Sequence, residues 1–193
     1  MSMATEALTG GFSDAPRQSA RAFRAALEAM ARPGSTYVLQ EMGDAPAPVS
    51  RAAATLLLVL CDPETPLHLA GDYDTEALRG WVTFHTGAPL LSADKAMFVL
   101  GSWRALDLSA LSLGTAEYPD RSATVIVDGA FNGVDVALRG PGIKDVTQSR
   151  LPEVAVFQDN AAQFPLGLDF YFTSGAKLSA LPRSTKVTLG GDV

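Results

Sequence analysis

The chain has 193 residues, of which 47% are hydrophobic and 19% charged, and its formal net charge is -6. This length suits one domain with a single buried core, and the composition excludes an intrinsically disordered chain. The acidic balance argues against nucleic acid as a partner, because sequence-blind binding to phosphate backbones needs clustered Lys and Arg.

A single domain is expected over 1–193, with a flexible segment at 1–12. That segment has neither the basic region nor the apolar stretch of a secretory signal. No part of the sequence approaches the roughly 20 apolar residues of a membrane span. The lone Cys61 cannot form a disulfide within the chain and is expected to be a small core residue. These features favour a cytoplasmic protein without membrane contact.

Helices and strands are predicted to alternate through the first half. An amphipathic helix is predicted over 13–33, because apolar residues recur there at helical spacing. These residues are Ala20, Phe23, Leu27 and Met30. A short strand, 36–40, follows a turn and contains β-branched and aromatic residues. The run 50–61 is apolar on all sides, which predicts a buried helix that lies against a sheet.

A brief strand at 67–70 is predicted to precede a helix that Asp74 caps. One face of this helix is expected to carry Leu78, Trp81, Val82 and His85. Two short apolar runs, 96–100 and 123–127, are typical of central strands that are covered on both faces.

The second half is richer in hairpins. Alternation over 134–138 and the Asn132-Gly133 turn predict an antiparallel hairpin between 123–127 and 134–138. A helix is predicted around 152–162. A second hairpin follows, in which 168–172 and 177–181 pair across Ser174-Gly175. The whole pattern predicts a mixed sheet with helices on both faces, a three-layer α/β/α sandwich.

No residue pattern marks a metal or cofactor site. Two His and one Cys cannot supply an ordinary structural zinc site. The turn 139–142 lacks the Lys and the Ser or Thr of a phosphate-binding loop, and no serine has the setting of a hydrolase nucleophile. Four lysines are present, but none lies in an evident Gly-rich pocket for a pyridoxal phosphate Schiff base. We therefore expect no metal and no cofactor.

His85 is the first candidate for a chemical role. Histidine changes charge near neutral pH, so His85 could act as a catalytic acid or base. The structural alternative is a histidine at a helix end that bonds free carbonyl groups. Thr86 beside it is a candidate for substrate binding. His68, within the strand 67–70, is assigned no chemical role.

A second candidate site follows Pro182. A rigid turn there could present the guanidinium of Arg183 and the hydroxyls of Ser184 and Thr185 to a phosphate or phosphonate. Arg183 is also a catalytic candidate, since its charge could stabilise a phosphoryl or phosphonyl group. The alternative is an ordinary polar junction between a strand and a turn.

Six segments of the sequence carry a family resemblance through their order and spacing. They are Phe23-Arg24 with Ala29-Met30-Ala31-Arg32-Pro33-Gly34, Phe84-His85-Thr86-Gly87-Ala88-Pro89, Leu113-Gly114-Thr115 before Pro119, Gly140-Pro141-Gly142-Ile143, Phe164-Pro165-Leu166-Gly167-Leu168-Asp169 and Pro182-Arg183-Ser184-Thr185. From about residue 14 to residue 187 the chain resembles the phosphonate metabolism protein PhnH, a component of the bacterial carbon-phosphorus lyase system.

The resemblance implies a function in phosphonate catabolism. It implies a core complex with the G, I and J subunits of that system, a homodimer when isolated, and a fold similar to pyridoxal-phosphate-dependent transferases without that cofactor. The PhnH component, together with the G and I subunits, is associated with releasing adenine from ATP and attaching phosphonate to the ribose C1′ carbon. Cleavage of the carbon-phosphorus bond belongs to the J subunit.

We therefore expect a component of a phosphonate-ribosyl transferase and lyase complex that is not catalytic alone. The resemblance assigns no catalytic residue. Two alternatives stay open: a catalytic group contributed to a shared site, which would contact ATP or phosphonate, and an independent pyridoxal-phosphate enzyme.

Overall fold

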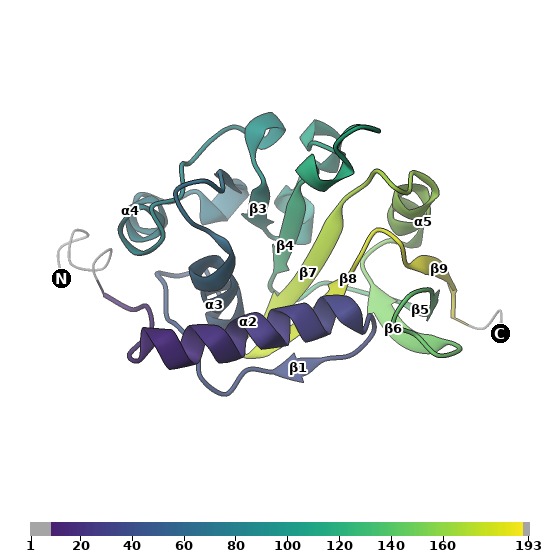
Figure 1. The fold of residues 1–193 in the computed structure, drawn as a ribbon, viewed down its shortest axis with the longest axis horizontal. Coiled ribbons are helices and arrows are strands. Elements are labelled where there is room, and N and C mark those ends of the chain that lie inside the picture. Colours follow the sequence, from purple (N-terminus) through teal and green to yellow (C-terminus); the bar gives the residue numbers. More distant parts are fainter. Residues whose placement is uncertain (1–8, 191–193) are drawn as a thin grey trace.

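A computed structural model describes residues 9–190 and has a six-stranded mixed sheet as its main element (Figure 1). Its strands are β1 (Tyr37–Val38), β2 (Leu67–Leu69), β3 (Phe98–Gly101), β4 (Thr124–Asp128), β7 (Asp169–Ser174) and β8 (Lys177–Leu181). They lie in the order β1-β8-β7-β4-β3-β2. Neighbours among β2, β3, β4 and β7 are parallel, whereas β8 pairs antiparallel with both β7 and β1. The predicted α/β class, the mixed sheet and the hairpin of β7 with β8 are confirmed.

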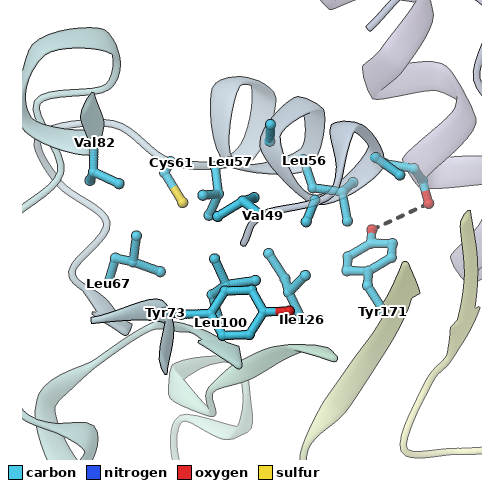
Figure 2. Packing of buried hydrophobic residues seen from close by; sticks show 14 of the residues in the cluster. Val49, Leu56, Leu57, Cys61, Leu67, Tyr73, Val82, Leu100, Ile126 and Tyr171 are labelled. Carbon is cyan, nitrogen blue, oxygen red and sulfur yellow. Dashed lines mark hydrogen bonds between the residues drawn. The ribbon is translucent and has the colours of Figure 1, made fainter. Parts of the chain in front are cut away.

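Three helices cover one face of this sheet. They are α2 (Ala15–Ala31), α3 (Arg51–Leu60) and α4 (Glu76–His85). Leu56 and Leu57 of α3 point toward Leu100 and Ile126 of the central strands (Figure 2). Fully burying a side chain of this size stabilises the fold by about 1.5–3 kcal/mol relative to leaving it exposed. The helices and the strands therefore share one continuous core on this side.

The opposite face is covered by a second sheet together with a helix. These elements are β5 (Val134–Arg139), β6 (Thr147–Leu151), β9 (Lys186–Leu189) and α5 (Val154–Ala162). The second sheet is antiparallel in the order β6-β5-β9. The buried ring of Phe157 in α5 lies 5.0 Å from the ring of Phe170 in β7. The predicted three-layer sandwich is confirmed in part, because this layer contains strands as well as a helix.

The predicted hairpin between 123–127 and 134–138 is wrong. β4 pairs with β3 and β7, whereas β5 pairs with β6 and β9 in the second sheet. Alternation identifies a strand without identifying its partner, since pairing depends on which surfaces bury the apolar face. Two further strands, β6 and β9, are short and rich in polar residues, and their local pattern does not predict them.

The helix α3 forms as its sequence predicts. Ser50 caps it, because the serine side chain accepts a hydrogen bond from the backbone N–H of Ala53 at 3.2 Å. The helix buries six successive residues, from Ala52 to Leu57. Within residues 9–190 no helix is both long and apolar enough to cross a membrane.

The apolar stripe predicted to bury α2 faces outward in part. Phe23 and Leu27 are 45% and 54% exposed, while the buried positions are Ala22, Ala26 and Ala29. Alanine side chains let the axis of α2 approach α3 closely, which bulky side chains at these positions would prevent. The prediction of an amphipathic helix is confirmed, but its apolar stripe is buried only in part, since Met30 packs against the core whereas Phe23 and Leu27 do not lie in the buried face.

The cap of α4 also differs from the prediction. Thr75, not Asp74, caps the helix, since its hydroxyl accepts a hydrogen bond from the backbone N–H of Leu78 at 3.1 Å. The Asp74 carboxylate instead forms a two-point ion pair with the Arg79 guanidinium. Hydrogen bonds from Arg79 hold the pKa of Asp74 below its ordinary value. A threonine one residue later therefore displaces the acid from the capping position.

Cys61 lies in the core as predicted, at the end of α3. Burial raises the pKa of its thiol to about 12. An unfolded chain releases this proton from about pH 9, whereas the folded chain retains it, so the free energy of unfolding should fall as the pH rises from 9 toward 12. Urea unfolding across this pH range should show the fall in the free energy of unfolding, and the fall should be smaller for the Cys61→Ala variant. A steady free energy of unfolding in the wild type would contradict the prediction.

Candidate functional site

The first predicted site, at His85 and Thr86, lies where α4 ends. The His85 ring is half-buried and lies 4.9 Å from the ring of Trp81 between centroids. Its Nε2 atom lies 3.3 Å from the carbonyl oxygen of Thr9. A carbonyl can only accept, so this bond requires a proton on Nε2 and leaves Nδ1 as the acceptor of the neutral ring.

A stretch of the N-terminal segment covers this histidine. Gly11 has a positive φ of 78°, and a Cβ atom there would lie 2.9 Å from the His85 ring. The backbone N–H of Gly11 also donates to the carbonyl oxygen of Asp44 at 3.0 Å. Residues 1–8 of the segment predicted to be flexible lie outside the described residues. The imidazole therefore contacts the chain's own backbone on one side.

The hydroxyl of Thr86 forms hydrogen bonds with backbone groups at the C-terminal end of α4. It donates to the carbonyl oxygen of Val82 at 2.8 Å and accepts from the backbone N–H of Ala88 at 3.1 Å. This arrangement satisfies backbone groups that a helix end leaves open. A ligand would have to replace one of these bonds to use the hydroxyl.

The second predicted site, around Arg183, is an intramolecular clamp. The Nε and Nη2 atoms of Arg183 donate to the Asp169 carboxylate at 3.2 and 2.5 Å. Nη2 also donates to the hydroxyl of Ser122. Nη1 donates to the carbonyl oxygens of Pro119 and Pro165, at 2.8 and 3.5 Å. The guanidinium has five N–H donors, and these partners occupy all of them.

Three of the segments that carry the family resemblance meet at this clamp. Arg183 belongs to one, Asp169 and Pro165 to another, and Pro119 closes the third. The latter two segments are also joined directly, because the backbone N–H of Gly167 donates to the carbonyl oxygen of Leu113 at 3.1 Å. This contact network favours the structural reading of the motif at 182–185, while a role in substrate binding stays a prediction.

The two hydroxyl residues after Arg183 differ in their surroundings. Ser184 is half-buried, and its carbonyl oxygen lies 3.2 Å from where a Cβ atom would stand on Gly140. Thr185 is 1% exposed, and its hydroxyl is buried without a hydrogen-bond partner within the described residues. A ligand could not reach Thr185 unless the chain opened.

The two predicted sites do not combine into one. His85 is the last residue of α4, and Arg183 lies between β8 and β9. Along the long axis of the molecule, α4 lies at one end and β9 at the other (Figure 1). Within 9–190 no three His, Cys, Asp or Glu side chains are placed to hold a metal ion.

A pocket that the sequence analysis missed lies at the carboxyl ends of β3 and β4. Its volume is about 350 Å³, and it is lined by the loop segments 102–104 and 130–132, which follow these strands closely. Ligands of open α/β sheets bind beyond the carboxyl ends of parallel strands. The sequence contains part of the signal, because both runs are predicted to be central strands. The parallel pairing of β3 and β4 then places the residues that follow them at one edge of the sheet.

The walls of this pocket are aromatic and polar. The half-buried ring of Trp103 stacks on Phe157 with 5.5 Å between centroids. The half-buried ring of Phe131 lies 5.6 Å from Phe172. Ser102, Arg104 and Asn132 supply the polar groups of the lining.

The buried carboxylate of Asp128 lies near this edge of the sheet, but its hydrogen bonds connect it to the side covered by the helices. Asp128 ends β4, and its carboxylate accepts bonds from the backbone N–H of Ser50 at 2.7 Å and the hydroxyl of Thr173 at 2.8 Å. Ser50 caps the N-terminus of α3, so the carboxylate lies at the positive end of a helix dipole. Phe131 and Trp103 instead contact the core beneath α5.

Comparison with known proteins gives consistent matches over nearly the whole chain. The family described as "Bacterial phosphonate metabolism protein (PhnH)" matches residues 10–188. A protein of Rhizobium meliloti (strain 1021), named alpha-D-ribose 1-methylphosphonate 5-triphosphate synthase subunit PhnH, is 32% identical over 197 residues, covering 97% of this chain and 98% of that protein. HtxG of Stutzerimonas stutzeri, which carries the name of a putative C-P lyase subunit protein, is 31% identical over 191 residues, covering 92% of this chain and 89% of HtxG.

Proposed function

Because the chain belongs to the PhnH family of bacterial phosphonate metabolism proteins, we propose that it is a subunit of an alpha-D-ribose 1-methylphosphonate 5-triphosphate synthase. The observation that carries this proposal is the family match over residues 10–188. It is supported by a relative of that name whose similarity covers almost the full length of both proteins.

The chain acts within a complex and not as a self-sufficient enzyme. The separation of the two predicted sites and the occupied donors of Arg183 support this reading. Its partners are the G, I and J subunits of the carbon-phosphorus lyase system, and it is a homodimer when isolated. It is a cytoplasmic protein without a cofactor of its own. Its fold is similar to that of pyridoxal-phosphate-dependent transferases.

Deletion of the gene tests this function. The deletion strain should fail to grow with methylphosphonate as the sole phosphorus source, and the wild-type gene should restore growth. Growth on inorganic phosphate should be unchanged, which controls for general fitness. The purified chain should not consume ATP with methylphosphonate. Turnover by the isolated chain, or undiminished growth of the deletion strain, would contradict the proposal.

A second candidate function is a catalytic group contributed to a shared site. His85 is the better candidate for it, because Nδ1 of its neutral ring is left as an acceptor. His85→Ala should then leave the complex assembled but unable to support growth on phosphonate. His68→Ala is the matched control, as the other histidine of the chain. Equal growth of both variants would exclude this role.

The independent pyridoxal-phosphate enzyme has a simple spectroscopic test. An internal aldimine should absorb at about 420 nm after the chain is incubated with the cofactor. A flat spectrum would dismiss this alternative.

A further inference from the structure

We propose that the pocket between segments 102–104 and 130–132 binds a nucleoside phosphate, with the base against Trp103 and Phe131 and the phosphate at Arg104. No function is otherwise assigned to these residues. The inference deepens the proposed function and rests on it, since the substrate of such a synthase must carry a ribose and phosphate groups.

Trp103 and Phe131 form an aromatic wall of the pocket. Trp103 stacks on Phe157, and Phe131 lies at a tilt of 55° against Phe172. Both residues are half-buried and line the pocket, so part of each ring stays open to it. Aromatic side chains of this kind stack on nucleobases. Because the core contacts hold both rings, a base would meet surfaces that are already ordered.

Arg104 is the positively charged residue of the pocket lining. It is exposed, and within residues 9–190 it has no ion-pair or hydrogen-bond partner. The acid on the same loop, Asp107, accepts bonds from the N–H and hydroxyl of Ser109. A guanidinium with its donors free suits the two-point recognition of a phosphate group. This contrasts with Arg183, whose donors are all occupied.

The surrounding charges permit an anion at this position. The Asp128 carboxylate serves the opposite, helical side of the sheet. Arg150 is tied to the residue that follows the lining segment 130–132, because its Nη2 donates to the carbonyl oxygen of Gly133 at 2.7 Å, and its charge is paired with that of Asp135. The volume of about 350 Å³ lies within the usual range of small-molecule sites, about 300–1,000 Å³.

Direct titration of the purified full chain tests the site. ATP should bind measurably by calorimetry at about 1 mM or below, while adenosine alone and tripolyphosphate alone should each bind more weakly. ATP should also change the fluorescence of Trp103, because the second tryptophan, Trp81, is fully buried. The Trp103→Phe variant should lose this signal.

Matched arginine variants identify the anion contact. Arg104→Ala should weaken ATP binding by at least about tenfold and leave adenosine binding unchanged. Arg24→Ala, which removes an exposed arginine from α2, should bind ATP like the wild type. The proposal of this binding site would be wrong if the Arg104→Ala variant bound ATP as tightly as the wild type. It would also be wrong if the wild type bound no ATP.

Growth of the deletion strain separates this inference from the proposed function. If the wild-type gene restores growth but the chain does not bind ATP, the site is wrong and the function stands. If the chain binds ATP through Arg104 but the deletion strain grows undiminished on methylphosphonate, the proposed function is wrong and the site stands.

Discussion

Replacing Arg183 with alanine is expected to lower the free energy of unfolding by about 3 kcal/mol, because it leaves a partly buried carboxylate and several acceptors without their donor. The side chains of Arg183 and Asp169 are only 13% and 24% exposed. For a domain of this size the melting temperature should fall by about 6–12 °C. Urea unfolding followed by circular dichroism measures the first quantity, and calorimetry the second.

Arg150→Ala is the matched control. Arg150 also pairs with an aspartate, Asp135, but the two side chains are 68% and 77% exposed. An exposed pair of this kind contributes about 1 kcal/mol or less. If Arg183→Ala proved as stable as Arg150→Ala yet failed to support growth on phosphonate, Arg183 would be a functional residue and the structural reading of the clamp would be wrong.

Gly142→Ala is expected to destabilise the fold by about 3–5 kcal/mol, because it combines a left-handed backbone with an overlap. Gly142 has a φ of 80°, and a Cβ atom there would lie 1.9 Å from the carbonyl oxygen of Ala31, the last residue of α2. The neighbouring backbone of α2 would have to move. The turn 140–143 and the end of α2, both of which carry the family resemblance, can therefore lie in contact only because residue 142 has no side chain.

Gly175→Ala separates the two contributions. Gly175 also has a positive φ, 59°, but nothing lies within 4 Å of a Cβ atom placed on it. Its replacement should cost only the backbone strain, about 1–2 kcal/mol. Denaturant unfolding of both variants gives the comparison. Equal losses for Gly142→Ala and Gly175→Ala would show that the turn 140–143 does not pack on α2 as described.

The candidate sites show how far residue type alone can lead. Arg183 lies in one of the segments that carry the family resemblance, but an arginine that binds a phosphonate and an arginine that ties three loops together have the same local pattern. Only the positions of Asp169, Ser122 and Pro119 distinguish them. Arg104 belongs to no recognised motif, so its residue type alone does not indicate a role in ligand binding.

Local sequence patterns were sufficient to predict the type of most elements and the family. The apolar run of α3, the central strands β3 and β4 and the β7–β8 hairpin all follow from local periodicity and turn residues. The long-range contacts were needed to establish that β5 joins a second sheet, that α2 buries its alanines and exposes Phe23, and that two strand ends form a pocket. Local periodicity reflects contacts within an element, whereas pairing, burial and pockets depend on segments far apart in the chain.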